Sequence, residues 1–273
     1  MSSVMPVFIP GQAGRLFAIY HHPATGEKAK KAILHIPAFA EEMNKSRRMI
    51  AMQAREFAKS GYAVLIFDLF GTGDSEGKFS DATWEIWKND VHTVCQWLIE
   101  QGILNISLWS LRSGILLAMD FLEDAKIKFD RMLCWQPVLN GEIFIMQFLR
   151  LRVAAALMDK SAHPEKASDL KQQLLDGKVV EVAGYTLHPD LINPLMKLFS
   201  DNIHFSKIDN INVFELISSC EKGISPGINK LIESLQQRAH LVSVHVVVGS
   251  SFWSTQEIAE VPELITQTVN SLY

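Results

Sequence analysis

The sequence has few cysteines, no block of like charge and no long apolar run. Its three cysteines, Cys95, Cys134 and Cys220, lie far apart and are odd in number, which argues against a secreted disulfide framework and favours reduced thiols in a cytoplasm. The formal net charge is −4 with acids and bases interleaved, and no basic stripe with stacking aromatics occurs, so we expect no nucleic-acid partner. No window approaches the ~18 apolar residues that a membrane-spanning helix needs, so we expect no integral membrane segment.

The first ten residues and the overall composition exclude further classes. The segment MSSVMPVFIP has neither the basic region nor the long apolar core of a signal peptide. The 273 residues are 48% hydrophobic and 21% charged, which are values of a globular protein rather than a disordered one. We therefore expect a cytoplasmic globular protein of one large domain or two modest ones.

Apolar runs alternate with segments of helical periodicity through most of the chain. Apolar runs without internal alternation are typical of buried parallel strands. Such strands are predicted at 31–36, 62–67, 106–109, 131–135, 211–217 and 241–248, and helices at 46–59, 82–100, 113–123, 227–238 and 261–272. Strands separated by helices predict an α/β fold with a mostly parallel central sheet flanked by helices.

The alternation stops at about residue 138 and resumes at about residue 205. The pattern between these points is helical with polar breaks. We therefore expect a first part of an α/β core at 1–137, a helical lid insertion at 138–205 and the last part of the core at 206–273. Ligand sites in such sheets lie beyond the carboxyl ends of the strands. Because the insertion begins at one of these ends, we expect it to cover the site.

The segment ISLWSLRSGILLA at 106–118 has the layout of a nucleophile elbow, G-x-S-x-G, in which a strand turns sharply into a helix. With Ser110 at the first small position and Gly114 at the last, the nucleophile position holds Arg112, whose guanidinium cannot attack a carbonyl. Placing Ser110 or Ser113 at the tip leaves large neighbours where the strained turn needs small ones. Ser110, Arg112 and Ser113 are nevertheless the candidate catalytic residues of this segment.

Arg112 would stand at the N-terminal end of a helix, where a cation is disfavoured by a few tenths of a kcal/mol or more. A negative partner is therefore expected. One alternative is a bound anion, held jointly by the guanidinium and the helix amides. The other is an internal salt bridge to one of the carboxylates Glu41, Glu42, Asp74 or Glu221.

The remaining members of a Ser-His-acid triad are also missing from their usual places. Glu221 is the one carboxylate close behind the strand at 211–217, and it is kept as a candidate catalytic acid. The stretch GSSFWSTQE after the strand at 241–248 contains no histidine. No histidine pairs with Cys, Asp or Glu at metal-ligand spacing, so no metal and no other cofactor is expected. Cys134 ends a predicted strand and is either a thiol nucleophile or a buried structural cysteine.

Loops at the ends of the strands supply the candidate pocket residues. The run at 35–48 is dense in charged and amide groups, and it supplies either an oxyanion amide or a structural network in which Asn44 or Ser46 caps the next helix. The loop at 68–77 is a tight polar turn, and no helix opens directly on its glycines as a dinucleotide site requires. Trp253 stands where a triad histidine would be. The candidate pocket residues are His35, Pro37, Ala38, Phe39, Glu41, Glu42, Asn44, Asp74, Ser75, Gly114, Phe252 and Trp253.

Several segments together carry a resemblance to a known family. They are PAFAEEMNKSRRM (37–49), DLFGTGDS (68–75), WEIW (84–87), LRSG (111–114), WQPVLNGE (135–142), QFLRLR (147–152), GY (184–185) and FW (252–253). On these segments, which run nearly the full length, the chain resembles the α/β-hydrolase superfamily and within it the exosortase A system-associated hydrolase 2 group. The stretches EEMNK and FW are specific, whereas DLFGTGDS is shared widely in the superfamily.

The resemblance implies an α/β-hydrolase fold and hydrolysis of an ester, thioester or amide. It also implies a bacterial setting, beside the export of surface proteins and the production of exopolysaccharide. An arginine at the elbow is usual for the group, so the resemblance makes Arg112 a trait of the group. A fold by itself does not establish a reaction.

Two hypotheses for the function follow. The first is a hydrolase or acyltransferase that acts on a small acyl substrate, with Ser110 or Ser113 as nucleophile or with water activated by Glu41, Glu42 or Glu221. The second is a pseudo-enzyme whose pocket holds a small anionic ligand through Arg112, or which binds a partner of the export system. In either case the expected partner is a small acyl or anionic molecule, with a homodimer left open.

Overall fold

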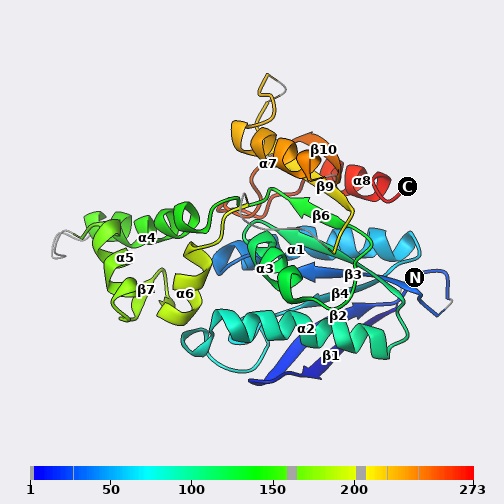
Figure 1. The fold of residues 1–273 in the computed structure, drawn as a ribbon, viewed down its shortest axis with the longest axis horizontal. Helices are drawn as coiled ribbons and strands as arrows, with labels where there is room; N and C mark the ends of the chain where they lie inside the picture. Colours follow the sequence, from blue (N-terminus) through cyan, green and yellow to red (C-terminus); the bar gives the residue numbers. More distant parts are fainter. Residues whose placement is uncertain (1–2, 27, 159–164, 201–206, 220, 239) are drawn as a thin grey trace.

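A computed structural model describes residues 3–26, 28–158, 165–200, 207–219, 221–238 and 240–273. Its centre is an eight-stranded sheet with the strand order β1-β2-β4-β3-β5-β6-β9-β10 (Figure 1). β1 and β2 run antiparallel to each other and β2 runs antiparallel to β4, while the remaining pairs are parallel. The strands are β1 (Val4–Pro10), β2 (Arg15–His21), β3 (Lys31–Ile36), β4 (Ala63–Phe67), β5 (Asn105–Leu111), β6 (Met132–Trp135), β9 (Asn210–Ile217) and β10 (Leu241–Val248).

Two apolar layers enclose the sheet, because successive residues of each inner strand point to opposite faces. In β3, Leu34 packs in one layer and Ile33 in the other. The first layer contains the helices α2 (Trp84–Glu100), α3 (Gly114–Asp124) and α7 (Pro226–Gln237). The second contains α1 (Glu41–Lys59) and α8 (Pro262–Asn270). This arrangement confirms the mostly parallel sheet flanked by helices.

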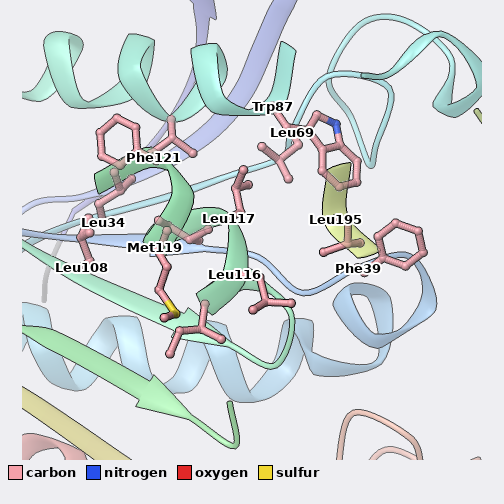
Figure 2. Close-up of a cluster of buried hydrophobic side chains, with 14 of the residues drawn as sticks. Leu34, Phe39, Leu69, Trp87, Leu108, Leu116, Leu117, Met119, Phe121 and Leu195 are labelled. Atoms are coloured by element: carbon pink, nitrogen blue, oxygen red, sulfur yellow. The ribbon is translucent and has the colours of Figure 1, made fainter. Parts of the chain in front are cut away.

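The helix α3 lies in the middle of the first layer. Figure 2 shows its side chains Leu116, Leu117 and Phe121 among side chains of the sheet and of α2. Burying a leucine or phenylalanine of this kind stabilises a fold by roughly 1.5–3 kcal/mol relative to leaving it exposed. The buried side chains of α3 therefore hold the turn that leads into this helix in place.

The segment between β6 and β9 contains α4 (Gly141–Met158), α5 (Ala167–Leu175), a hairpin of β7 (Val180–Val182) and β8 (Tyr185–Leu187), and α6 (Pro189–Met196). These elements lie together at one side of the sheet, in green and yellow in Figure 1. Residues 159–164 and 201–206 of the segment, and Cys220 further on, lie outside the described residues. The division of the chain at 138 and 205 into core and lid stays a prediction.

Some element boundaries differ from those expected. α1 begins at Glu41, five residues before the expected start, so Asn44 and Ser46 lie inside the helix and cap nothing. The N-cap is Ala40, which makes no side-chain hydrogen bond. The sequence pattern also missed the β1–β2 hairpin, the three-residue strands β7 and β8 and a short 3-10 helix at Phe79–Asp81. None of the helices in the described ranges is long and apolar enough to cross a membrane.

Candidate functional site

Residues 110–114 form the expected strand–turn–helix elbow, with Arg112 at its tip. Arg112 has a φ of 53°, in the left-handed region that non-glycine residues enter at a cost of about 1–3 kcal/mol. Gly114 is required by close packing, because a Cβ there would lie 2.5 Å from the carbonyl oxygen of Ile36 and 2.6 Å from that of Pro37. The turn therefore aims the side chain at position 112 out over the carboxyl ends of the strands.

Strained backbone gathers around this turn. Four of the described non-glycine residues have a positive φ, and three of them, Ala40, Arg112 and Gln136, directly follow or lie close behind β3, β5 and β6. Gln136 is held by two hydrogen bonds to β9, since its N–H donates to the carbonyl of Phe214 and its Oε1 accepts the N–H of Leu216. Such strain clusters at functional sites.

The Arg112 side chain is held between a carboxylate and an indole. Its Nε donates to Glu42 Oε1 at 3.1 Å, and its Nη1 lies 3.5 Å from the carbonyl oxygen of Gln136. The guanidinium carbon lies 5.1 Å from the ring centroid of Trp253, in the range of a cation–π interaction. Glu42 is one of the four carboxylates expected to meet Arg112, so the internal pair exists.

Glu42 has an unusual environment for a carboxylate. Burial raises its pKa above the ordinary value, and the charge and hydrogen bond of Arg112 offset this in part. Its Oε2 is buried and has no hydrogen-bond partner in the described chain. The side chains of Arg112 and Glu42 are 18% and 21% exposed. The pair thus keeps an unused acceptor at the base of the elbow.

The candidate nucleophiles do not reach this place. Ser110 is fully buried within the sheet, where it faces Cys134 of the neighbouring strand. Burial raises the pKa of the Cys134 thiol to about 12, so that thiol stays protonated. The Oγ of Ser113 accepts the N–H of Phe39 at 3.0 Å, on the core side of the turn. The geometry therefore contradicts Ser110, Ser113 and Cys134 as nucleophiles.

The same hydrogen bond affects the oxyanion hole. In an acyl-transfer site of this layout, one oxyanion donor is a backbone N–H of the loop after the third strand. Here the N–H of Phe39, in the loop after β3, is already donated to Ser113. Within the loop at 35–48, which was expected to supply an oxyanion amide, the N–H of Phe39 is therefore already occupied.

A cavity of about 250 Å³ opens at the elbow. Arg112, Glu41, Glu42 and Lys45 supply its polar groups, and Trp253 covers one side. Another wall comes from α4, the first helix of the segment between β6 and β9. The other lining residues are Phe39, Phe144, Gln147, Phe148, Leu151 and Ser254. We call this cavity the elbow pocket.

Only part of the expected pocket set lines the elbow pocket, namely Phe39, Glu41, Glu42 and Trp253. His35, Pro37 and Ala38 line a different cavity, and Gly114 and Ser113 border only a void of about 10 Å³. Four further residues of the expected set line none of these three cavities. Asn44 donates to Tyr185 Oη and Glu41, the N–H of Asp74 and the hydroxyl of Ser75 donate to Asp68, and Phe252 packs on Trp135.

Glu221, the expected catalytic acid, does not line the elbow pocket. It is exposed in the loop after β9, and no described interaction joins it to Arg112 or to the elbow pocket. Since a triad acid must orient a histidine beside the nucleophile, Glu221 has no such role here. Within the described ranges no group of three or more His, Cys, Asp or Glu side chains could hold a metal ion.

The sequence reasoning missed the wall that α4 contributes. Phe39 projects from the loop after β3 into an aromatic cluster, with its ring centroid 5.2 Å from Phe148 and 5.9 Å from Phe144. The hydroxyl of Tyr185, in β8, donates to Glu41 at 3.1 Å. Phe148 was within a motif of the resemblance, but polar and apolar residues are mixed around α4, so its pattern did not indicate which face meets the core.

Comparisons with known proteins bear on the fold. The X-Pro dipeptidyl-peptidase (S15 family) model matches residues 15–143, which include the elbow. No curated protein sequence matches the chain. Est1E from Butyrivibrio proteoclasticus, in a structure with ferulic acid bound, is 15% identical over 97% of each chain with a TM-score of 0.66.

Two further solved structures agree. An α/β serine hydrolase homologue from Coxiella burnetii is 14% identical over 100% of this chain and 99% of that chain, with a TM-score of 0.58. An esterase from Pyrococcus furiosus is 13% identical over 99% of this chain and 89% of that chain, with a TM-score of 0.60. At such identities the likeness concerns the architecture. The chain therefore has the α/β-hydrolase fold.

Proposed function

We propose that this chain is a pseudo-enzyme of the α/β-hydrolase fold that binds a small anionic molecule with an apolar body in the elbow pocket. The observation that carries the proposal is the side chain at the tip of the elbow. Arg112 occupies the nucleophile position, pairs with Glu42 and lies against Trp253, which replaces the triad histidine. A guanidinium offers hydrogen-bond donors and charge, but no nucleophile.

The polar groups of the pocket suit a carboxylate or a sulfonate. The contacts of Arg112 use Nε and Nη1, so Nη2 is left to donate. Lys45 lines the same pocket and forms no ion pair within the described chain. Two donors on one anion, with one of them from arginine, give the charge-assisted hydrogen bonds that fix such groups.

The apolar walls suit a ring or a short acyl chain. Phe144, Phe148 and Leu151 of α4 face the pocket together with Trp253. A cavity of about 250 Å³ lies slightly below the usual range of drug-sized pockets and fits a compact ligand. The likeness to an esterase that has bound ferulic acid supports an aromatic acid as one form of this ligand.

Hydrolysis remains a second candidate because of Glu42. Its raised pKa and its unpaired Oε2 are features of a general base. In that mechanism Glu42 takes a proton from water, the hydroxide attacks the ester carbonyl, and Arg112 stabilises the oxyanion. Collapse of the intermediate then breaks the bond to the alcohol, which leaves with the proton from Glu42. The esterases among the similar structures favour the same substrate class.

The cellular setting is proposed from the resemblance in the sequence. We place the protein in the bacterial cytoplasm, beside the export of surface proteins and exopolysaccharide. The buried thiols of Cys95 and Cys134 accord with a reducing compartment. A lid role for the segment at 138–205 belongs to the same proposal, since α4 walls the elbow pocket.

One set of assays separates the two candidates. Calorimetric titration with benzenesulfonate measures binding, and p-nitrophenyl acetate and butyrate measure hydrolysis. We expect saturable binding to the wild type, at least tenfold weaker binding to Arg112→Ala and no ester turnover above buffer. Arg48→Ala is the matched control, because Arg48 pairs with Glu260 outside the pocket. Ester turnover that Glu42→Gln abolishes would establish the hydrolase instead.

A further inference from the structure

A second cavity, of about 180 Å³, is lined in part by the β3–α1 turn and the start of α1. Its walls come from β2, β3, β4, β5 and α1, and it shares no lining residue with the elbow pocket. The lining is mostly apolar, with Ile50, Phe67 and Leu111 among the larger side chains. We call it the α1 cavity. Neither function proposed for the elbow pocket involves the α1 cavity.

His35 is the polar group that distinguishes the α1 cavity from an ordinary packing gap. The residue is 3% exposed, and its Nδ1 lies 3.1 Å from the carbonyl oxygen of Trp109. Because a carbonyl only accepts, Nδ1 carries the hydrogen and Nε2 carries a lone pair. Burial lowers the pKa of His35 to about 3, so the ring is neutral at physiological pH.

The Nε2 atom of His35 has no hydrogen-bond partner in the described chain. Nε2 is not among the fully buried atoms that lack a partner, so this acceptor is accessible from the cavity that His35 lines, where a donor can reach it. A fixed tautomer makes the requirement specific, since the partner must bring a hydrogen. A bound water or a ligand hydroxyl meets it.

The charged residues of the α1 cavity neutralise one another. Nη2 of Arg47 donates to both carboxylate oxygens of Asp68, at 3.1 and 3.2 Å, and Asp68 also accepts the N–H of Asp74. The hydroxyl hydrogen of Ser46 is donated to the carbonyl of Glu42. The cavity therefore presents a free acceptor without an unpaired charge, which disfavours an ionic occupant.

We propose that the α1 cavity binds a small neutral alcohol or phenol, whose hydroxyl donates to Nε2 of His35 and whose body packs on the apolar walls. The volume agrees, since an apolar cavity of about 150 Å³ in another protein accepts benzene. Arg47 is the exposed member of the lining, with 43% of its side chain accessible, so the cavity reaches the surface beside it. The ligand differs in charge from that of the elbow pocket.

The test compares phenol with fluorobenzene, which has nearly the same shape but no donor. Titration is followed by calorimetry and by 15N NMR of protein labelled on histidine. The resonance that is missing from His35→Leu identifies the His35 ring. Phenol should bind with a stoichiometry of one and shift the Nε2 resonance of that ring, whereas fluorobenzene should bind at least tenfold more weakly and leave the resonance in place. Absence of saturable phenol binding, or equal binding of both probes without a shift, would overturn the proposal.

Two variants test whether phenol binds in the α1 cavity. His35→Leu removes the acceptor and should weaken phenol binding at least tenfold. Ala51→Phe fills the cavity from α1 and should abolish binding even if the first variant does not fold. Arg112→Ala should leave phenol binding unchanged. Loss of the phenol proposal and loss of the anion proposal can therefore be told apart. Phenol binding that is lost in Arg112→Ala and kept in Ala51→Phe would assign the probe to the elbow and refute the second site.

Discussion

Arg112 keeps a left-handed backbone at a turn where a small nucleophile would ordinarily stand. The strain is tolerated because the side chain is fixed on three sides, by Glu42, by the Gln136 carbonyl and by Trp253. The residue type at the tip thus decides the chemistry of the pocket, while the fold decides only its place. Three predictions belong to single residues.

Arg112→Ser should not create a hydrolase. The substitution supplies a hydroxyl at the elbow, but Trp253 stands where the base would be and the N–H of Phe39 remains donated to Ser113. A serine without a base is a weak nucleophile. Turnover of p-nitrophenyl acetate should equal that of buffer, and a fluorophosphonate probe should not label position 112. Stoichiometric labelling there would contradict the assignment of Trp253.

Anion binding at the elbow should strengthen as the pH falls. Above its pKa, Glu42 is ionised, competes for the Arg112 guanidinium and repels an incoming anion. Because burial raises that pKa, protonation sets in nearer to neutrality than for an ordinary glutamate. Benzenesulfonate stays ionised throughout, so its affinity reports the protein alone. Calorimetric titrations from pH 7.5 to 5 should show the rise.

The control for this pH effect is Glu42→Gln. It should bind benzenesulfonate about tenfold more tightly at pH 7.5, because removing one like charge a few ångströms from the anion is worth on the order of 1 kcal/mol or more. Its affinity should change little with pH. A pH dependence that persists in the variant would assign the effect to another group.

Gln53→Met should stabilise the protein. Gln53 is fully buried on the inner face of α1, and neither atom of its amide has a hydrogen-bond partner in the described chain. A methionine of similar shape removes the unpaired groups, which we expect to raise the free energy of unfolding by about 1 kcal/mol. Urea denaturation measures it. Gln96→Met, at an exposed position of α2, should change stability far less.

At the scale of elements, the position where α1 begins organises both cavities. A helix that starts at Glu41 carries Glu41, Glu42 and Lys45 on one side and Met43 and Ser46 on the other, by its period of 3.6 residues. The first set lines the elbow pocket, and the second lines the α1 cavity. The first turns of α1 therefore separate residues that the sequence predicted to line one pocket into two cavities.

This division could not be predicted, because the start of α1 has no sequence signature. Ala40 makes no side-chain cap, whereas the sequence pattern predicts a polar cap at Asn44 or Ser46. By contrast, the strands at 31–36 and 241–248 were predicted with their observed bounds, since unbroken apolar runs are typical of parallel strands. The meeting of Arg112 with an acid was also predictable, because a cation at a helix start requires one.

Tyr185→Phe tests the contact between β8 and α1. The substitution removes a hydroxyl that donates to Glu41 and accepts from Asn44, while the ring keeps its packing on Phe79. Because the hydrogen bonds are exposed, we expect a loss of only about 0.5–1 kcal/mol. Amide exchange in 180–187 should become faster. Tyr273→Phe, at an exposed site, is the control and should leave those amides unchanged.

At the scale of the whole molecule, the two apolar layers hold the sheet, and a few buried carboxylates make its stability depend on pH. Asp90 of α2 is the clearest case. It lies 1% exposed, and its Oδ2 accepts the N–H of Phe70 at 2.8 Å. Burial raises the pKa of Asp90 to about 7.

The sign of the Asp90 effect follows from linkage. The unfolded chain releases this proton near the ordinary value of 3.8, whereas the folded chain retains it to about pH 7. Stability contributed by this group should therefore fall as the pH rises from about 4 to about 7, by an amount on the order of a few kcal/mol, and then level off. Asp90→Asn keeps an acceptor for Phe70 and should remove this fall. Urea denaturation at several pH values measures it, with the exposed Asp130→Asn as the unchanged control.

The central claim is that the elbow of this fold binds an anion through Arg112 instead of carrying a nucleophile. A crystal structure grown with benzenesulfonate tests it most directly. The account predicts the sulfonate on Arg112 and Lys45, with the ring between Trp253 and Phe148. An elbow pocket without the sulfonate, or a sulfonate bound elsewhere with Arg112 still closed on Glu42, would contradict it.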